Sequence, residues 1–144
     1  MSYRREILTA FADKLKTISV ANGFNTNLAK NVSTELVLWD EVTSGFPFVC
    51  VTAGMETREY LPSGFKWGFV SLTARVYTYG DLGVRDLDKL IQDIERLADQ
   101  NQALSFGPNT TTDINLLQIV TDEGVLLPFS VAEMSFNVRY PVPQ

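Results

Sequence analysis

The chain has 144 residues, of which 45% are hydrophobic and 20% charged, a composition typical of a folded globular domain rather than a disordered chain. Twelve Lys and Arg against 17 Asp and Glu give a net charge of −5, which argues against sequence-independent DNA binding. Histidine is absent and Cys50 is the single cysteine, so His-assisted nucleophiles, an internal disulfide and a Cys-rich zinc site are excluded. We therefore expect no catalytic residue, no metal and no cofactor.

The first predicted element is a helix that starts after Ser2, a plausible N-cap, and ends near Val20. Gly23 is suited to a left-handed stop after it. The prediction depends on apolar residues at spacings of three and four, namely Ile7, Leu8, Phe11, Ala12, Leu15 and Ile18. Residues 22–34 predict a polar loop, and a short strand is expected from Leu36 to Trp39.

Two longer strands are predicted next, from Phe48 to Ala53 and from about Trp67 to Tyr79. The second alternates cleanly between apolar and polar positions. Pro62-Ser63-Gly64 has the composition of a turn, so the two strands form a hairpin. The residues between the strands exceed what a tight turn needs, and we expect the hairpin to project beyond the core from about Glu56 to Gly68.

The second helix is predicted from Val84 to Gln100, with Leu90, Ile94 and Leu97 on its buried side. Its far side carries Asp88, Glu95 and Asp99, a candidate acidic face at the surface or in a lumen. A loop is expected around Gly107-Pro108-Asn109. Two further strands, about Ile114 to Thr121 and Ser130 to Tyr140, close the chain around an Asp122-Glu123-Gly124 turn.

This order of elements predicts an α+β fold, in which a mixed, largely antiparallel sheet has two main helices on one face and a projecting β-hairpin. No repeat or linker is visible, so residues 1–144 are expected to form one domain. No signal peptide or bilayer-spanning apolar run is visible either, and no membrane partner is expected.

Charge is distributed unevenly along the chain. Residues 1–34 carry a net charge of +3, residues 35–83 carry −3, and residues 84–144 carry −5. A molecule with a basic end and an acidic end can stack on copies of itself or on partners through complementary potentials. The alternative is a surface whose charge is merely heterogeneous.

The candidate interface is the hairpin, where aromatic and basic side chains surround the turn. Rings and arginines are the usual anchors of protein interfaces, which singles out Arg58, Tyr60, Leu61, Phe65 and Trp67. The alternative is that these rings fold back onto the protein's own core. Asp86 and Asp88 point to different sides of a helix and do not form a metal site. Cys50, between two valines, is expected to be a buried and inert thiol.

Several segments together resemble the tail terminator, or tail completion, proteins of long-tailed bacteriophages, typified by the minor tail protein U family of phage lambda. They are Gly23-Phe24-Asn25-Thr26-Asn27, Leu38-Trp39-Asp40-Glu41, Phe46-Pro47-Phe48-Val49-Cys50-Val51-Thr52-Ala53-Gly54, Glu56 and Tyr60 in the hairpin, the helix from Asp86 to Asp99, and Phe136-Asn137-Val138-Arg139-Tyr140. The resemblance covers essentially the whole chain and lies in order and length more than in any single residue.

The resemblance implies an α+β fold and a homohexameric ring that caps the tail tube, stops its polymerisation and meets the head-side connector or stopper protein. It also implies passage of DNA through the lumen without sequence recognition, and a place at the head-proximal end of the virion tail after assembly in the host cytoplasm. The tail tube protein is an implied partner, and the tape measure protein a possible one. The resemblance carries over no defined site residues.

Two other functions remain open from the residues. One is a small ferredoxin-like ligand-binding or regulatory domain, which would be a monomer or dimer with one apolar pocket. The other is a hydrolase or isomerase that uses carboxylates, for example Asp40 and Glu41 near Trp39, in a cleft that raises a carboxylate pKa.

Overall fold

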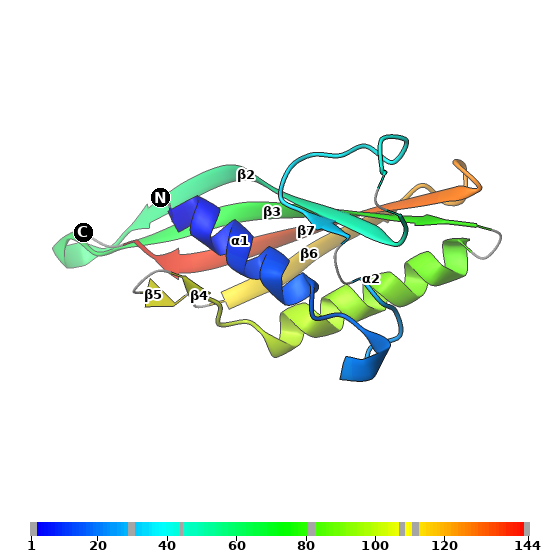
Figure 1. The fold of residues 1–144 in the computed structure, drawn as a ribbon. Coiled ribbons are helices and arrows are strands. Elements are labelled where there is room, and N and C mark those ends of the chain that lie inside the picture. Colours follow the sequence, from blue (N-terminus) through cyan, green and yellow to red (C-terminus); the bar gives the residue numbers. More distant parts are fainter. Residues whose placement is uncertain are drawn as a thin grey trace.

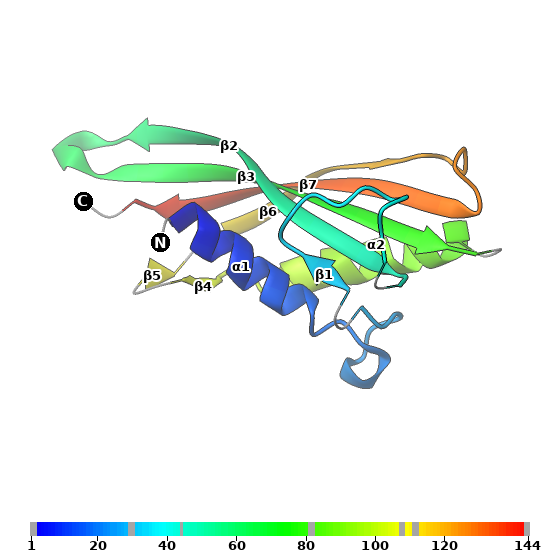
Figure 2. The same ribbon diagram turned by 45° about the horizontal axis from the view of Figure 1, so that its top comes forward.

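The structure, a computed structural model, describes residues 3–28, 31–43, 45–80, 83–106, 109–110 and 113–142. Two helices lie against one face of a long, twisted sheet (Figures 1 and 2). The elements in chain order are α1 (Tyr3–Leu15), the 3-10 helix η1 (Val20–Asn22), β1 (Val32–Ser33), β2 (Phe48–Tyr60), η2 (Pro62–Gly64), β3 (Lys66–Tyr79), α2 (Gly83–Gln100), β4 (Ser105–Phe106), β5 (Asn109–Thr110), β6 (Asp113–Thr121) and β7 (Phe129–Pro141). The predicted α+β class is confirmed.

The main sheet has the strand order β1-β2-β3-β7-β6, and β4 and β5 form a separate small hairpin. Only β1 pairs in parallel, with β2; the other pairs are antiparallel. Helix α1 packs against β1 and β2, whereas α2 packs against β3, β7 and β6. Each helix therefore covers one half of the same sheet face. Neither helix is long and apolar enough, over the described ranges, to cross a bilayer.

The core lies between the helices and this face of the sheet. The predicted alternation in β3 is confirmed, because Val70, Leu72, Ala74 and Val76 are all buried toward the helices. The predicted stripe of α2 is also buried, and its members are Leu87, Leu90, Ile94, Leu97 and Ala98. The strongly amphipathic α2 thus forms where burial of one face stabilises it.

The opposite face of the sheet has a second, smaller apolar cluster. Phe48, Cys50 and Tyr77 are buried there under the loop of residues 34–46, which contributes the partly buried side chains of Val37, Trp39, Val42 and Phe46. The Tyr77 hydroxyl donates to the Val37 carbonyl at 2.6 Å. Burial is the main cause that raises the pKa of Tyr77 above its ordinary value. Cys50 is buried, as predicted.

Two local predictions were wrong, and a third was right in conformation but not in the helix concerned. Helix α1 ends at Leu15 rather than near Val20, because Thr17 and Ile18 bond back only three residues and tighten the chain into a turn. The residues from Leu36 to Trp39 form no strand; alternate side chains pack on the sheet face while their backbone stays outside the ladder, and the short parallel strand is β1. Gly23 is left-handed, but it follows η1.

Two further sequence predictions fall wholly or partly outside the described residues. Ser2, the predicted N-cap, lies outside the described residues. The predicted loop around residues 107–109 contains the short strands β4 and β5, with residues 107 and 108 outside the described part of the chain.

Candidate assembly interface

The predicted hairpin is present and is longer than its core requires. Strands β2 and β3 pair from Phe48 opposite Tyr77 to Tyr60 opposite Lys66. They extend past the N-terminal end of α1, where no helix covers them (Figure 2). We name residues 58–67, the outer part of this hairpin, the arm. Its turn is tight, because Leu61 donates its N–H to the Phe65 carbonyl at 2.8 Å and Ser63 and Gly64 adopt left-handed φ angles of 72° and 77°.

The tip of the arm is apolar and exposed. Tyr60 is 72% exposed, Leu61 37% and Phe65 39%. The ammonium of Lys66 lies 5.4 Å from the centre of the Tyr60 ring. Single exposed apolar residues are common on protein surfaces, but a cluster on a projecting turn is typical of a site that another chain covers.

The other two candidate interface residues have partners within the chain and lie on opposite faces of the arm. The Trp67 ring is half-buried, with Phe65 edge-on at 5.3 Å and the Arg139 guanidinium 4.4 Å above it. Arg139 also pairs with Asp113 at 2.7 Å. On the helix-facing side, Arg58 pairs with Glu56 at 3.0 Å. All three of Tyr60, Leu61 and Phe65 are therefore exposed at the tip, with Tyr60 on the face of Arg58 and Phe65 on the face of Trp67.

Glu56 connects the base of the arm to the body of the protein. Its carboxylate receives Arg4 of α1 at 3.4 Å, Arg58 at 3.0 Å and the Tyr140 hydroxyl at 3.2 Å. Arg4 also donates to the carbonyl of Ala53 at 2.6 Å. Burial, followed by the charge of Glu56, raises the pKa of the Tyr140 hydroxyl. No local pattern predicts this cluster, since Arg4 and Glu56 are 52 residues apart.

The candidate acidic face is exposed as predicted. Asp88, Glu95 and Asp99 lie on the side of α2 that faces away from the sheet. Another carboxylate of the same helix, Asp93, was not singled out from the sequence, and it is buried, with only 1% exposed. It accepts bonds from the N–H groups of Asn25 and Thr26 and from the Thr26 hydroxyl, at 2.6–3.1 Å. The sequence does indicate that Asp93 is buried, because this residue lies on the apolar stripe of α2, directly before Ile94.

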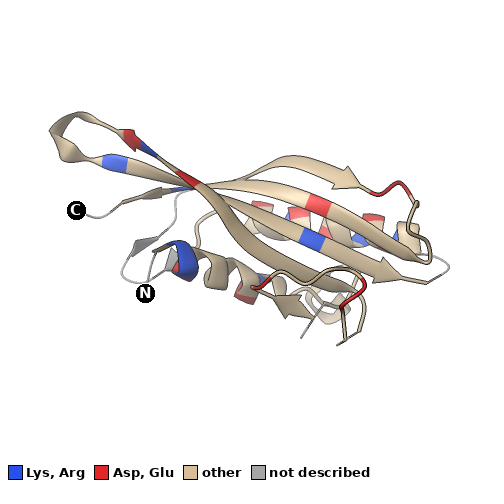
Figure 3. Cartoon of the chain, turned by 90° about the horizontal axis from the view of Figure 1, so that it is seen from above, with Lys and Arg blue, Asp and Glu red and all other residues tan. Residues whose placement is uncertain are grey.

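The sheet face away from the helices carries little charge in its centre. Figure 3 looks onto this face, where charged segments gather on the arm and at the ends of the molecule. The central strands pair Arg75 with Glu133 at 3.4 Å. Around this pair the outward residues are small and polar, namely Ser71, Thr73, Ser135 and Asn137.

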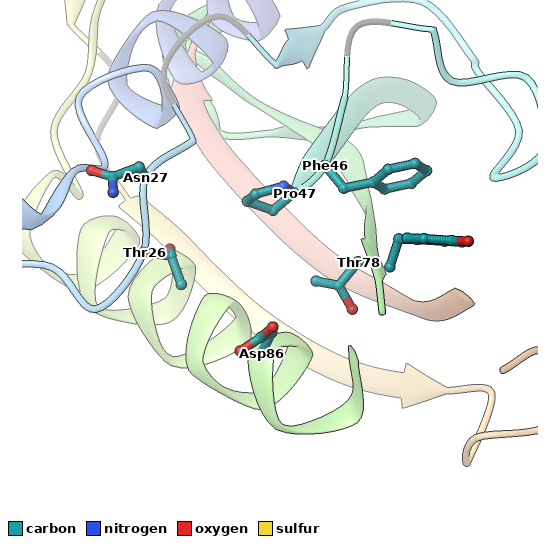
Figure 4. A pocket seen from close by; sticks show the side chains of 7 residues that line it. Thr26, Asn27, Phe46, Pro47, Thr78 and Asp86 are labelled. Carbon is teal, nitrogen blue, oxygen red and sulfur yellow. The ribbon is translucent and has the colours of Figure 1, made fainter. Parts of the chain in front are cut away.

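A cleft of about 400 Å³ lies at the end of the sheet opposite the arm. Figure 4 shows the side chains that line it, from the start of α2, the strand ends and the loop before β1, namely Thr26, Asn27, Phe46, Pro47, Thr78, Tyr79 and Asp86. Asp86 is its one carboxylate, and the Thr78 hydroxyl is committed to the Gly83 carbonyl at 2.6 Å. Such a lining offers no acid–base pair.

The carboxylates considered for catalysis lie elsewhere. Asp40 and Glu41 are exposed on the loop before β2, and Glu41 accepts the N–H of Leu38 at 3.2 Å. Across the described ranges, no group of three or more Cys, Asp or Glu residues could hold a metal ion. The arm is our candidate for a functional surface.

An exposed apolar tip on a projecting hairpin is a feature typical of proteins that assemble with other chains. The chain belongs to the family described as "Bacteriophage Tail Tube Terminator Protein", which it matches over residues 1–144. It is 32% identical to tail tube terminator protein p142 of Escherichia phage T5, covering all of this chain and 97% of that protein. The predicted tail terminator relationship is confirmed, although the matching family is not the lambda U family in particular.

The fold also resembles a chain in the virion of a native gene transfer agent particle. The TM-score is 0.71, with 98% of each chain covered, at 10% sequence identity. At this identity the similarity concerns the fold alone.

Proposed function

We propose that this protein is the tail tube terminator of a long-tailed phage, and that six copies form a ring that caps the tube and stops its polymerisation. The full-length match to the terminator family carries this proposal. The ring would stand at the head-proximal end of the tail, after assembly in the host cytoplasm. Its far surface would meet the head-side connector, and the tape measure protein would be a further contact. Six chains of 16.1 kDa would give a particle of about 97 kDa.

The arm is our candidate for the contact with a partner chain. Its tip exposes Tyr60, Leu61 and Phe65, while its base is tied to α1 through Glu56 and Arg4. A tip held on a fixed base loses little conformational freedom on binding, which favours affinity. Arg58 and Trp67, fixed by their neighbours, would frame the contact rather than anchor it.

Shortening the arm tests this role. Replacement of Tyr60–Lys66 by Asn-Gly places a tight turn between Glu59 and Trp67, which already face each other in the ladder. We expect an unchanged circular dichroism spectrum, since both helices and the core are untouched, and loss of tail-length control in a phage that carries the variant. The measurement is tail length by electron microscopy.

A point variant separates binding from folding. Tyr60→Ser removes an exposed ring, and Val20→Ser removes an apolar side chain that is also exposed but lies on η1. We expect abnormal tails with Tyr60→Ser and normal tails with Val20→Ser. Normal tails with both Tyr60→Ser and the shortened arm would contradict the role of the arm.

The acidic face has a separate test in the same ring. If Asp88 and Asp99 line a lumen, lysine at these positions would attract the DNA phosphates and slow DNA passage without changing the mass of the ring. The measurement is the rate of DNA ejection from phages that carry Asp88→Lys and Asp99→Lys. An unchanged rate would assign these carboxylates to the outer surface.

A further inference from the structure

The main sheet has two open edges at opposite ends of its strand order. Strand β6 is the last strand on one side. On the other side, β1 pairs only with Val49 and Cys50, so within the described residues the edge of β2 carries no strand beyond Cys50. Open edges present unpaired backbone groups and are templates for pairing with another chain. One of these groups is already used, since the Ala53 carbonyl accepts a bond from Arg4.

The β6 edge carries none of the lysines or prolines that often keep an edge strand from pairing with other chains, although it contains one bulge. It contains no Lys, Arg or Pro, and its one charged residue, Asp113, is paired with Arg139. Three apolar side chains on it are exposed, Leu117 by 67%, Ile119 by 40% and Val120 by 49%. A bulge at Leu117 interrupts the ladder with β7 and turns that side chain outward. A long apolar edge of this kind is expected to be covered in the working assembly.

The two open edges occupy the same position along the strand direction of the sheet. Following the pairs across β7 and β3, Asp113 stands in one row with Thr57, and Ile119 stands in one row with Val51. Residues 113–119 of β6 therefore occupy the same rows as the open residues 51–57 of β2. Suppose that two copies are related by a rotation about an axis parallel to the strands, with no translation along that axis. The two stretches would then lie side by side.

Strand direction agrees with this arrangement. Strands β2, β3, β7 and β6 alternate in direction, so β2 and β6 run oppositely. A rotation about the strand direction preserves directions, and β6 of one copy would lie antiparallel to β2 of the next. The pattern of the sheet would then continue across the boundary between copies, as it does in a closed barrel.

The helices beside the two edges carry opposite net charge. The helix beside β2 is α1, within residues 1–34, which carry a net charge of +3. The helix and turn beside β6 belong to residues 84–144, which carry −5. Joining the β6 side of one copy to the β2 side of the next brings opposite charges together, whereas joining two β6 sides brings like charges together. The occupant favoured for the β6 edge is thus the β2 edge of a second copy.

We propose that neighbouring subunits join head to tail by antiparallel addition of β6, residues 113–119, to β2, residues 51–57, of the next copy. Such a heterologous contact closes into a ring when a full turn is a whole-number multiple of the rotation angle between neighbouring copies. The inference rests on the ring of the proposed function. It also leaves the arm free, because residues 58–67 extend beyond the first row of β6.

Paired cysteines test the contact directly. Leu116 and Ala53 share one row of the sheet, and the exposed Leu117 and Met55 lie just to either side of that row, because the two strands run oppositely. A short spacer can therefore join them. Cys50 is buried and leaves the background free of reactive thiols. With a short bis-maleimide, the double variant Leu117→Cys/Met55→Cys should give a ladder of covalent oligomers up to the hexamer. Each single variant should give none.

The same variants identify the outcomes that overturn the inference. Covalent dimers from Leu117→Cys alone would show that β6 pairs with β6. A ring of about 97 kDa without a ladder from the double variant would refute the edge contact and leave the proposed ring intact. Wild-type protein that stays monomeric both in solution and in isolated tails would refute the ring, and with it the edge contact.

Placing positive charges on the β6 edge gives a second, independent test of the contact between subunits. Leu117→Lys/Ile119→Lys places two cations on the β6 edge, and Val125→Lys/Leu127→Lys places two on exposed apolar positions of the turn that follows. We expect the first pair to reduce the particle to monomers in multi-angle light scattering and the second to leave its mass unchanged. Circular dichroism checks that both remain folded. A full-sized ring from the first pair would contradict the edge contact.

Discussion

Gly68 lies under the ring of Tyr140, its partner in the antiparallel ladder between β3 and β7. A Cβ on residue 68 would stand 2.6 Å from the ring carbon that bears the hydroxyl, closer than any ordinary contact. The missing side chain allows the ring to lie flat on the strand and its hydroxyl to reach Glu56 at 3.2 Å. The base of the arm is therefore built around a glycine for steric reasons.

Gly68→Ala should lower the free energy of unfolding by about 1–3 kcal/mol, because Tyr140 must leave its place or the strands must separate locally. Urea denaturation followed by circular dichroism measures this. Gly54→Ala is the matched control, since a Cβ there meets its nearest neighbour, the Ser71 carbonyl, only at 4.0 Å. Equal stability of the two variants would show that the close approach at Gly68 is relieved without cost.

Asp93→Ala should lower the free energy of unfolding more than the removal of an exposed acidic residue does. The carboxylate accepts the N–H groups of Asn25 and Thr26 and the Thr26 hydroxyl, and its removal leaves donors unpaired at a buried site. The free energy of unfolding should fall by about 1–3 kcal/mol. Asp88→Ala on the exposed side of the same helix should change stability by no more than about 0.5 kcal/mol. The two variants are compared by chemical denaturation, and similar small losses would contradict an anchoring role for Asp93.

Ile94→Ala tests the core beneath α2. The side chain is completely buried, so its truncation should cost roughly 2–5 kcal/mol. Glu95→Ala, one residue further and exposed, is the control. The midpoint of urea unfolding measures both. A loss below about 0.5 kcal/mol for Ile94→Ala would be that of a surface position.

Stability should fall at alkaline pH through two buried tyrosines. Burial raises the pKa of both Tyr77 and Tyr140 in the folded protein, while the unfolded chain ionises near the ordinary tyrosine pKa of about 10. The stabilisation is therefore complete below pH about 10 and is lost as the pH rises toward the folded values.

Tyr77→Phe/Tyr140→Phe should flatten this dependence. At neutral pH the double variant should be less stable by about 1 kcal/mol for each lost hydrogen bond, to Val37 and to Glu56. Thermal unfolding between pH 8 and about 11 gives both quantities. Parallel curves for the variant and the wild type would exclude these two hydroxyls as the cause of the alkaline loss.

Periodicity in the sequence by itself determined the helices, the long strands and the hairpin. The apolar spacing from Ile7 to Leu15 and from Leu87 to Ala98 predicts the buried stripes, and alternation from Val70 to Val76 predicts the core face of β3. These signals are local, because a helix or strand repeats its buried side every few residues. The charge difference between the two ends of the chain is likewise present in the sequence.

Tertiary structure alone decided which distant residues meet. Arg4 reaches Glu56 across 52 residues, and Thr26 bonds Asp93 across 67. The loop of residues 34–46 covers Tyr77, and the strand order leaves β6 and the outer part of β2 as open edges. Such contacts depend on how the layers pack, and neither side-chain spacing nor local propensity encodes them. A residue such as Asp93 has the same local pattern whether solvent or a neighbouring backbone satisfies its carboxylate, so only the packed structure distinguishes the two.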